Sequence, residues 1–319
     1  MAHFVRHIVA AAFAKISLHG GTPAGYGVLN HVTPHPNGET RIRTQLAAAI
    51  CEFVAAQSPG TSSDREVIEV QVFVLILWRY HNTQGAWDKM RPFVGSYCRG
   101  EITILEFQHC IRDMYGTNTS KSYLFSLGDG QRCSGGAGSW RKAAVAEIPG
   151  WRGAATSIAS TLIHPATTPE SFFEVFLKRL LRQIRLFDIG YWGKFLWGDL
   201  RNIRPDVVDL EQFTIVGVGC FKEIRHWGIA LKKNQILRQQ QGRKVLSEVK
   251  ECLDILIEQK HVNGLNMAVQ RGGLSMLSVY DIQDQFCERK RARCGLPPRL
   301  ASVRAPLENP SLEKLARHR

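Results

Sequence analysis

Two carboxylates near the C-terminal end of the chain have a spacing that suits acid–base chemistry. Asp281 and Glu288 lie seven residues apart, close to two turns of a helix, so both side chains would lie on one face. With Lys290 and Arg293 close by, they could form an acid pair that transfers protons beside cations that bind phosphate. The alternative is a set of ion pairs that hold a terminal helix in place, the ordinary role of mixed charges on a helix.

A second candidate site is a Gly-X-Gly turn inside FTIVGVGCFKEIRHWG, residues 213–228. Glycine suits a turn that needs a positive φ or brings the backbone close to another molecule, and Gly217 and Gly219 occupy those positions. In a helix-hairpin-helix module, the amides of such a turn, at the start of the second helix, bind a phosphate. Lys222 and Arg225 would lie just inside that helix. A plain corner between two helices is the alternative.

The same turn does not fit two common nucleotide-binding motifs. The chain contains no G-x-x-x-x-G-K-[ST] segment, so we do not expect an autonomous P-loop kinase. The turn also lacks the third glycine and the distant acidic residue of a Rossmann site. We therefore expect no cofactor.

The charge of the chain indicates an anionic partner. Its 319 residues include 41 Lys and Arg against 28 Asp and Glu, a net charge of +13. We expect nucleic acid, with DNA favoured over RNA, while an anionic membrane surface and an inert basic surface are the alternatives. No run of about 18 uncharged apolar residues is present, so we expect no integral membrane segment.

The eight cysteines form no C-x-x-C pair and are scattered along the chain. A disulfide framework or a structural zinc site usually shows tighter, repeated spacings. We therefore expect reduced thiols, no metal centre and an intracellular, reducing compartment. The sequence leaves open whether that compartment is the nucleus, a virus-infected host cell or an organelle such as the mitochondrion.

Helical patterns dominate, so we expect a mainly α fold. Residues 66–80 are almost continuously apolar and form either a buried strand or a fully covered helix, and their length favours the helix. Residues 126–156 are rich in Gly and Ser and carry several cations, which favours a mobile basic loop or insertion between helical lobes. Further helices are expected at residues 40–57, 168–187 and 235–261.

The two ends of the chain differ from its middle. The first 38 residues contain no Asp or Glu, so we expect residues 1–40 to be an irregular or transit-like N-terminal segment, with an ordinary packed helix as the alternative. From Arg289 onward the chain has nine Lys or Arg against two Glu. Residues 295–319 are thus predicted to be a basic tail that contacts nucleic acid or a protein complex. A helical domain over residues 41–294 would lie between these ends.

Four segments of the chain resemble one family of helical proteins. They are FVLILWRYHN (73–82), GYWGKFLWGDL (190–200), FTIVGVGCFKEI (213–224) and SVYDIQDQFCERKRAR (278–293). Together they look like the family shared by the helical domain of 5-hydroxymethyluracil DNA kinases and the α-glutamyl/putrescinyl thymine pyrophosphorylases, which is assigned to the DNA-glycosylase-like superfamily. The resemblance spans about residues 66 to 294.

The resemblance implies a fold and a set of site residues. The fold would have two helical lobes around a basic cleft, with the Gly-X-Gly hairpin on its rim. Family members are implied to act on modified thymine in DNA, holding the base outside the stack. The positions nominated by the match are Arg79, Asn82, Asp199, Gly217, Gly219, Asp281, Cys287, Glu288, Lys290 and Arg293.

This match suggests a scheme for a transferase that resembles a thymine pyrophosphorylase or a glycosylase. Arg79 and Asn82 would read or position the base, and Asp281 with Glu288 would handle protons or an incoming amine. The alternative function is non-catalytic: a helical module that binds RNA or joins a ribonucleoprotein.

Aromatic residues could supply the walls of a base pocket. Three of them precede Asp199 in one short segment, namely Trp192, Phe195 and Trp197. Packing in the core is the commoner role of such side chains and is the alternative here.

Overall fold

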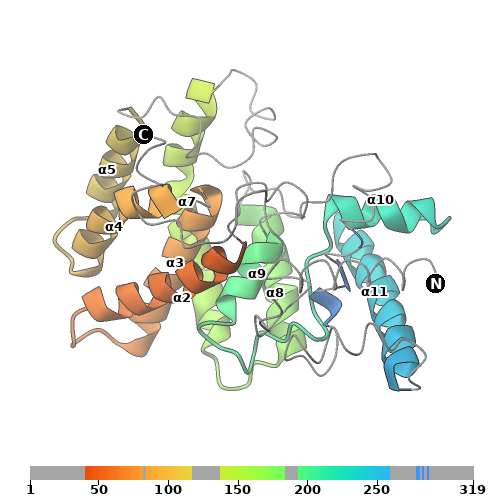
Figure 1. Cartoon of the computed structure of the whole chain (residues 1–319). Coiled ribbons are helices and arrows are strands. Elements are labelled where there is room, and N and C mark those ends of the chain that lie inside the picture. Colours follow the sequence, from red (N-terminus) through yellow and green to blue (C-terminus); the bar gives the residue numbers. More distant parts are fainter. Residues whose placement is uncertain are drawn as a thin grey trace, which may run out of the picture. The chain divides into compact units, whose positions relative to one another are not determined.

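The structure is a computed structural model that describes residues 40–81, 84–116, 137–183, 193–258, 278–280, 282–283 and 286 (Figure 1). Over these residues it contains nine helices and no strand, which confirms the mainly α fold for that part of the chain. Two compact units are present, and over the described residues the chain passes from one to the other between Thr44 and Gln45, within α2, and between Val208 and Asp209. None of the described helices is long and apolar enough to cross a membrane.

Helix α3 is the central element of the first unit, Gln45–Val208, because it contacts α4, α7 and α9. Its side chains at residues 72–78 are all buried, which explains the nearly continuous apolar run in the sequence and confirms the predicted helix. The helices of this unit are α2 (Thr40–Gln57), α3 (Asp64–His81), α4 (Gln84–Cys98), α5 (Ile104–Gly116), α7 (Ala137–Leu162), α8 (Pro169–Gln183) and α9 (Lys194–Leu200).

Local hydrogen bonds set where several of these helices begin. At the start of α3, the Glu66 carboxylate accepts the Ser63 N–H at 2.8 Å, and the Ser63 hydroxyl accepts the Glu66 N–H at 3.3 Å. At the start of α8, the Ser171 hydroxyl accepts the Thr168 N–H at 3.0 Å, and the Thr168 hydroxyl accepts the Ser171 N–H at 3.2 Å. Serine and threonine side chains therefore cap the start of these two helices.

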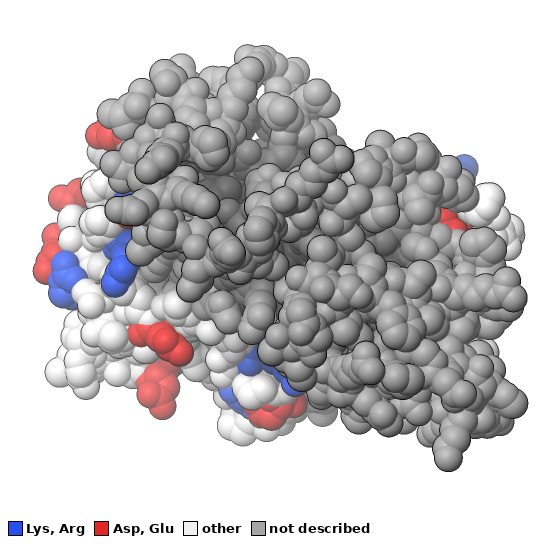
Figure 2. Space-filling view, in the orientation of Figure 1, with Lys and Arg blue, Asp and Glu red and all other residues white. Residues whose placement is uncertain are grey.

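The first unit holds little of the net charge of the chain. Residues 45–208 contain 18 Lys and Arg against 15 Asp and Glu. On the face drawn in Figure 2, acidic and basic side chains of the described residues are interspersed. Most of the positive excess is therefore carried by the remainder of the sequence.

Helix α7 corrects the loop that the sequence predicted over residues 126–156, because the chain is helical from Ala137 onward. Its buried apolar side chains recur at helical spacing, whereas Gly150 and Gly153 lie on its exposed side. Packing of the apolar face against α3 and α8 compensates for the weak helix propensity of these glycines. The buried residues with this spacing are Ile148, Trp151, Ala155, Ile158 and Leu162.

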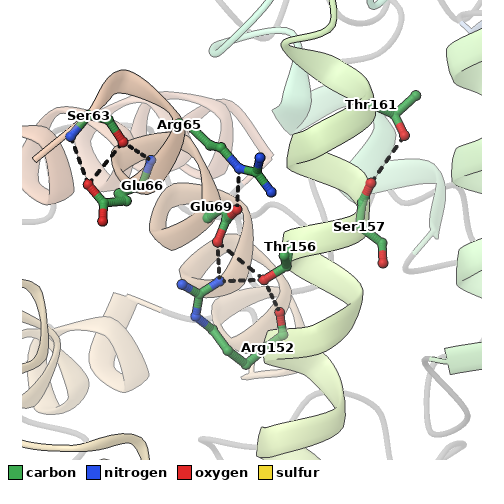
Figure 3. A network of polar contacts seen from close by, with 8 residues as sticks. All are labelled: Ser63, Arg65, Glu66, Glu69, Arg152, Thr156, Ser157 and Thr161. Atoms are coloured by element: carbon green, nitrogen blue, oxygen red, sulfur yellow. Dashed lines mark hydrogen bonds and ion pairs between the residues drawn. The ribbon is translucent and has the colours of Figure 1, made fainter.

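A polar network joins α7 to α3 and α4. The Glu69 carboxylate accepts hydrogen bonds from Arg65 Nε at 3.0 Å and from Arg152 Nη1 at 3.2 Å (Figure 3). Thr156 Oγ1 donates to the same carboxylate at 3.3 Å, and Arg152 Nε donates to the Tyr97 hydroxyl at 3.1 Å. Hydrogen bonds form only within a narrow range of distances and angles, so this network fixes which side of α7 faces α3.

Trp197 lies in an aromatic cluster between α8 and α9. Its ring stacks on Phe172 with 5.6 Å between the centroids, and its centroid lies 5.0 Å from that of Phe173 and 5.3 Å from that of Phe176. All four side chains are fully buried. Trp197 therefore packs in the core, which was the alternative to a place in the wall of a base pocket.

The second unit contains α10 (Val218–His226) and α11 (Gln235–Glu258), and α10 crosses the N-terminal end of α11 (Figure 1). The helices predicted after the Gly-X-Gly turn and within residues 235–261 are confirmed. Residues 214–217 are buried and lead into α10 without forming a helix. Close to this segment in sequence, the carbonyl of Glu211 accepts the Val279 N–H at 3.2 Å.

Candidate functional site

The Gly-X-Gly segment is the start of a helix rather than a hairpin with positive φ angles. Gly217 is the N-cap of α10 with φ −80° and ψ 160°, an extended conformation open to any residue, and Gly219 lies inside the helix. The described glycines with positive φ are Gly100 and Gly228. In the described range 193–258, the last helix before this segment ends at Leu200. The prediction of two helices joined directly by a glycine hairpin is therefore wrong.

The exposed part of α10 is positively charged. Lys222 and Arg225 are exposed, and Val218 precedes them on the same side. Lys222 follows the first turn of α10, as the sequence predicted, whereas Arg225 lies in the last turn. No side-chain hydrogen bond caps the helix at Gly217. The amides of its first turn and the positive end of the helix dipole thus lie close in sequence to one exposed cation, Lys222, an arrangement that favours an anion.

The stretch of sequence that contains α10 carries charge almost entirely of one sign, and it is bounded by the exposed acids Glu211 and Glu248. Between Gln212 and Ser247 the only acidic residue is Glu223, and its side chain is fully buried. The same stretch contains seven basic residues, which are Lys222, Arg225, Lys232, Lys233, Arg238, Arg243 and Lys244. Five of them are exposed, and Arg238 and Arg243 are half-buried. This stretch, residues 212–247, is called the basic surface below.

Helix α11 holds the segment that leads into α10. The side-chain amide of Gln239 accepts the Val216 N–H through Oε1 at 2.8 Å and donates to the Val216 carbonyl through Nε2 at 2.9 Å. The Arg238 guanidinium lies 5.3 Å from the Phe221 ring centroid, and that of Arg243 lies 5.5 Å from the Phe213 centroid. These contacts fix the start of α10 against α11.

In the first unit, the structure brings together three residues that were predicted from separate segments. Arg79 of α3 binds both carboxylate oxygens of Asp199 of α9, with 2.5 Å between Nη2 and Oδ1. The Arg79 guanidinium also lies 5.1 Å from the ring centroid of Phe195. Arg79 and Asp199 are 2% and 3% exposed, so the pair is removed from water.

Burial and the Arg79 guanidinium shift the pKa of the Asp199 carboxyl in opposite directions. Burial raises the pKa of the Asp199 carboxyl above its usual value, while the Arg79 guanidinium favours the ionised form and opposes that shift. Burial also raises the pKa of the Cys51 thiol, and the charge of Asp199 raises it further. Cys51 is therefore held as a neutral thiol beside the ion pair.

Sequence reasoning did not single out two neighbours of this pair. Lys194 is 3% exposed, and its Nζ lies 4.7 Å from the Phe195 ring centroid. The Trp78 ring lies 4.3 Å from Arg79 Cζ, and its Nε1 is buried without a hydrogen-bond partner. Nothing in the spacing of Lys194 distinguishes it from an exposed lysine, since its burial follows from the packing of α9 on α3.

Several predicted site residues lie outside the described residues, so the structure does not bear on them. They include the acid pair and its neighbouring cations, for which both alternatives stay open. The residues concerned are Asn82, Trp192, Asp281, Cys287, Glu288, Lys290 and Arg293.

These features define a mainly helical protein with a basic surface in one compact unit and a buried ion-pair cluster in the other. No family model matches the chain, and neither a curated protein nor a solved structure matches it.

Proposed function

We propose that this protein binds nucleic acid through the basic surface of its second unit. The observation that carries the proposal is the excess of seven cations over one buried acid in residues 212–247. Phosphate groups attract such a surface, and the release of their counterions drives binding. In this proposal the first turn of α10, whose N-cap Gly217 has no side chain to cap it, binds a phosphate together with Lys222.

The proposed nucleic acid is DNA that carries a modified thymine, and the proposed activity is modification of that base. This finer proposal comes from the resemblance to the thymine-hypermodification family. It is supported by the contact between Arg79 and Asp199, since the resemblance nominated both residues from separate segments and they lie together in the fold. In this scheme Asp281 and Glu288 handle protons or an incoming amine.

A second candidate function is RNA binding without catalysis. It is favoured by the burial of Arg79 and by its pairing with Asp199. Its guanidinium is 2% exposed and holds both oxygens of Asp199, so it is not available to read a base. An arginine in that position has the ordinary role of a structural ion pair. RNA binding would need only the basic surface and the tail.

The experiment that separates these functions is a titration of the purified protein with four labelled probes. The probes are duplex DNA with thymine, with 5-hydroxymethyluracil or with its pyrophosphorylated form, and a structured RNA, each at two salt concentrations. Mass spectrometry of the DNA then detects any change of a base. Preference for a modified duplex or a changed base mass would support base modification. Equal, steeply salt-dependent binding of all probes without product would support the second candidate.

A charge-matched pair of variants tests the location of the binding surface. The variant Lys222→Gln/Arg225→Gln removes two exposed cations from α10. We expect about tenfold weaker binding and a salt slope smaller by about two. The control Lys178→Gln/Arg182→Gln removes two exposed cations from α8 of the first unit and should change binding less than twofold. Equal losses in both variants would contradict the assignment to α10.

A further inference from the structure

The side chain of Gln239 forms hydrogen bonds with both the N–H and the carbonyl of Val216, which lies next to the proposed phosphate-binding end of α10. Val216 is fully buried, and its N–H and carbonyl have no regular helix or sheet to bond with. Gln239, itself 2% exposed, supplies both partners, at 2.8 Å and 2.9 Å. The position of Val216 is therefore set by a side chain of α11.

The contact between α11 and the start of α10 is also unusually close. Gly242 lies about one turn beyond Gln239, so both face the same segment. A Cβ atom at Gly242 would lie 2.7 Å from Cε1 of Phe221 and 3.1 Å from Cγ1 of Val216. A side chain at position 242 would therefore require the Phe221 ring of α10 to shift.

We propose that Gln239 is a positioning residue for the binding of a phosphodiester group by α10. Through Val216 it sets the place of Gly217, whose carbonyl accepts the Phe221 N–H at 2.9 Å in the first turn of the helix. That turn carries the amides, and Lys222 follows it directly. Gln239 itself is buried behind the segment, so it acts without touching the ligand. This inference rests on the proposed function.

The test uses Gln239→Met, which keeps the length of the side chain but removes its hydrogen bonds. The probe is a fluorescein-labelled thymine-containing DNA duplex of about 20 base pairs, which offers several phosphates to the surface. We expect about three- to tenfold weaker binding and a salt slope smaller by about one, because one phosphate contact is lost. Combined with Lys222→Gln, the effect should be less than additive, since both changes affect the same contact.

A purely structural role would not change the salt slope of protein that remains folded. Circular dichroism at the titration temperature identifies the folded variants. Gln240→Met is the matched control, because Gln240 is exposed at the adjacent position, and it should bind like the wild-type protein. Gly242→Ala is a second, independent variant that forces the Phe221 ring of α10 to shift, and it decides the test if Gln239→Met does not fold.

The outcomes separate this inference from the proposed function. Unchanged binding by Lys222→Gln/Arg225→Gln would overturn the proposed function and, with it, the inference. Weaker binding by that variant, together with an unchanged slope in folded Gln239→Met or Gly242→Ala, would overturn the inference alone. A reduced slope in either of these two variants, with the Gln240→Met control unaffected, would support it.

Discussion

Arg79 holds both carboxylate oxygens of Asp199, although 120 residues separate them in the sequence. Their side chains are 3% and 4% exposed, so the pair connects α3 to α9 in the interior of the first unit. Taking both charges out of water opposes folding, while their mutual attraction and hydrogen bonds offset that cost. The net contribution of the intact pair to the unfolding free energy is therefore small, whereas removal of one partner leaves an unpaired buried charge and costs more.

Asp199→Ala should therefore destabilise the protein strongly. The change leaves the Arg79 guanidinium buried without its carboxylate, and breaking a buried pair in this way costs about 3–5 kcal/mol of unfolding free energy. Urea denaturation followed by circular dichroism measures the loss. Asp206→Ala is the control, because the Arg204–Asp206 pair leaves Asp206 63% exposed and should lose less than about 1 kcal/mol. Equal urea midpoints for the two variants would contradict the prediction.

Arg152→Met should weaken the attachment of α7 to α3. It removes the bond to Glu69 and the bond to Tyr97 from a half-buried network, for a loss of about 1–3 kcal/mol. The control Arg112→Met removes an arginine whose pair with Asp113 is exposed, and it should change stability by about 0.5 kcal/mol or less. Thermal unfolding of both variants compares them. If Arg152→Met matched the control, the network would have no stabilising role.

Glycine substitutions at two exposed sites should act in opposite directions. Gly153 lies in α7 with open space around it, so Gly153→Ala should stabilise the protein by about 0.5–1 kcal/mol. Gly228 follows α10 with φ +81°, so Gly228→Ala should destabilise it by about 1 kcal/mol, despite similar open space. Urea midpoints test the signs, and a stabilising Gly228→Ala would contradict the conformation assigned to that turn.

Two glutamate carboxylates that accept backbone N–H groups at the starts of α3 and α5 should make the stability of the fold depend on pH. Backbone N–H groups hold the pKa of Glu66 at Ser63 and the pKa of Glu106 at Thr103 below their usual values. Because the folded pKa is the lower one, the ionised carboxylates stabilise the fold above the unfolded pKa, and this stabilisation is lost as the pH falls. The melting temperature of Glu66→Gln/Glu106→Gln should therefore drop less between pH 7 and pH 3 than that of the wild type. Equal drops would exclude the capping carboxylates as a source of acid sensitivity.

Much of the helical fold could be predicted because its signals are local. Caps at Ser63 and Thr168 lie directly before periodic apolar segments, and each cap needs only a residue three positions away. The loop predicted over 126–156 was wrong for residues 137–156, because the prediction relied on the low helix propensity that Gly and Ser have in isolation. The apolar face of α7 meets α3 and α8 only in the folded chain, and this packing outweighs propensity.

The sequence by itself determined the net positive charge, the helices and the presence of Lys222 and Arg225 within α10, since composition and short-range spacing suffice for these. Only the tertiary structure decided that Gly217 is extended, that Gln239 bonds to Val216, and that Arg79 meets Asp199. Each of these depends on residues distant in sequence approaching within a few ångströms. Such approaches follow from the packing of whole helices, which no short stretch of sequence encodes.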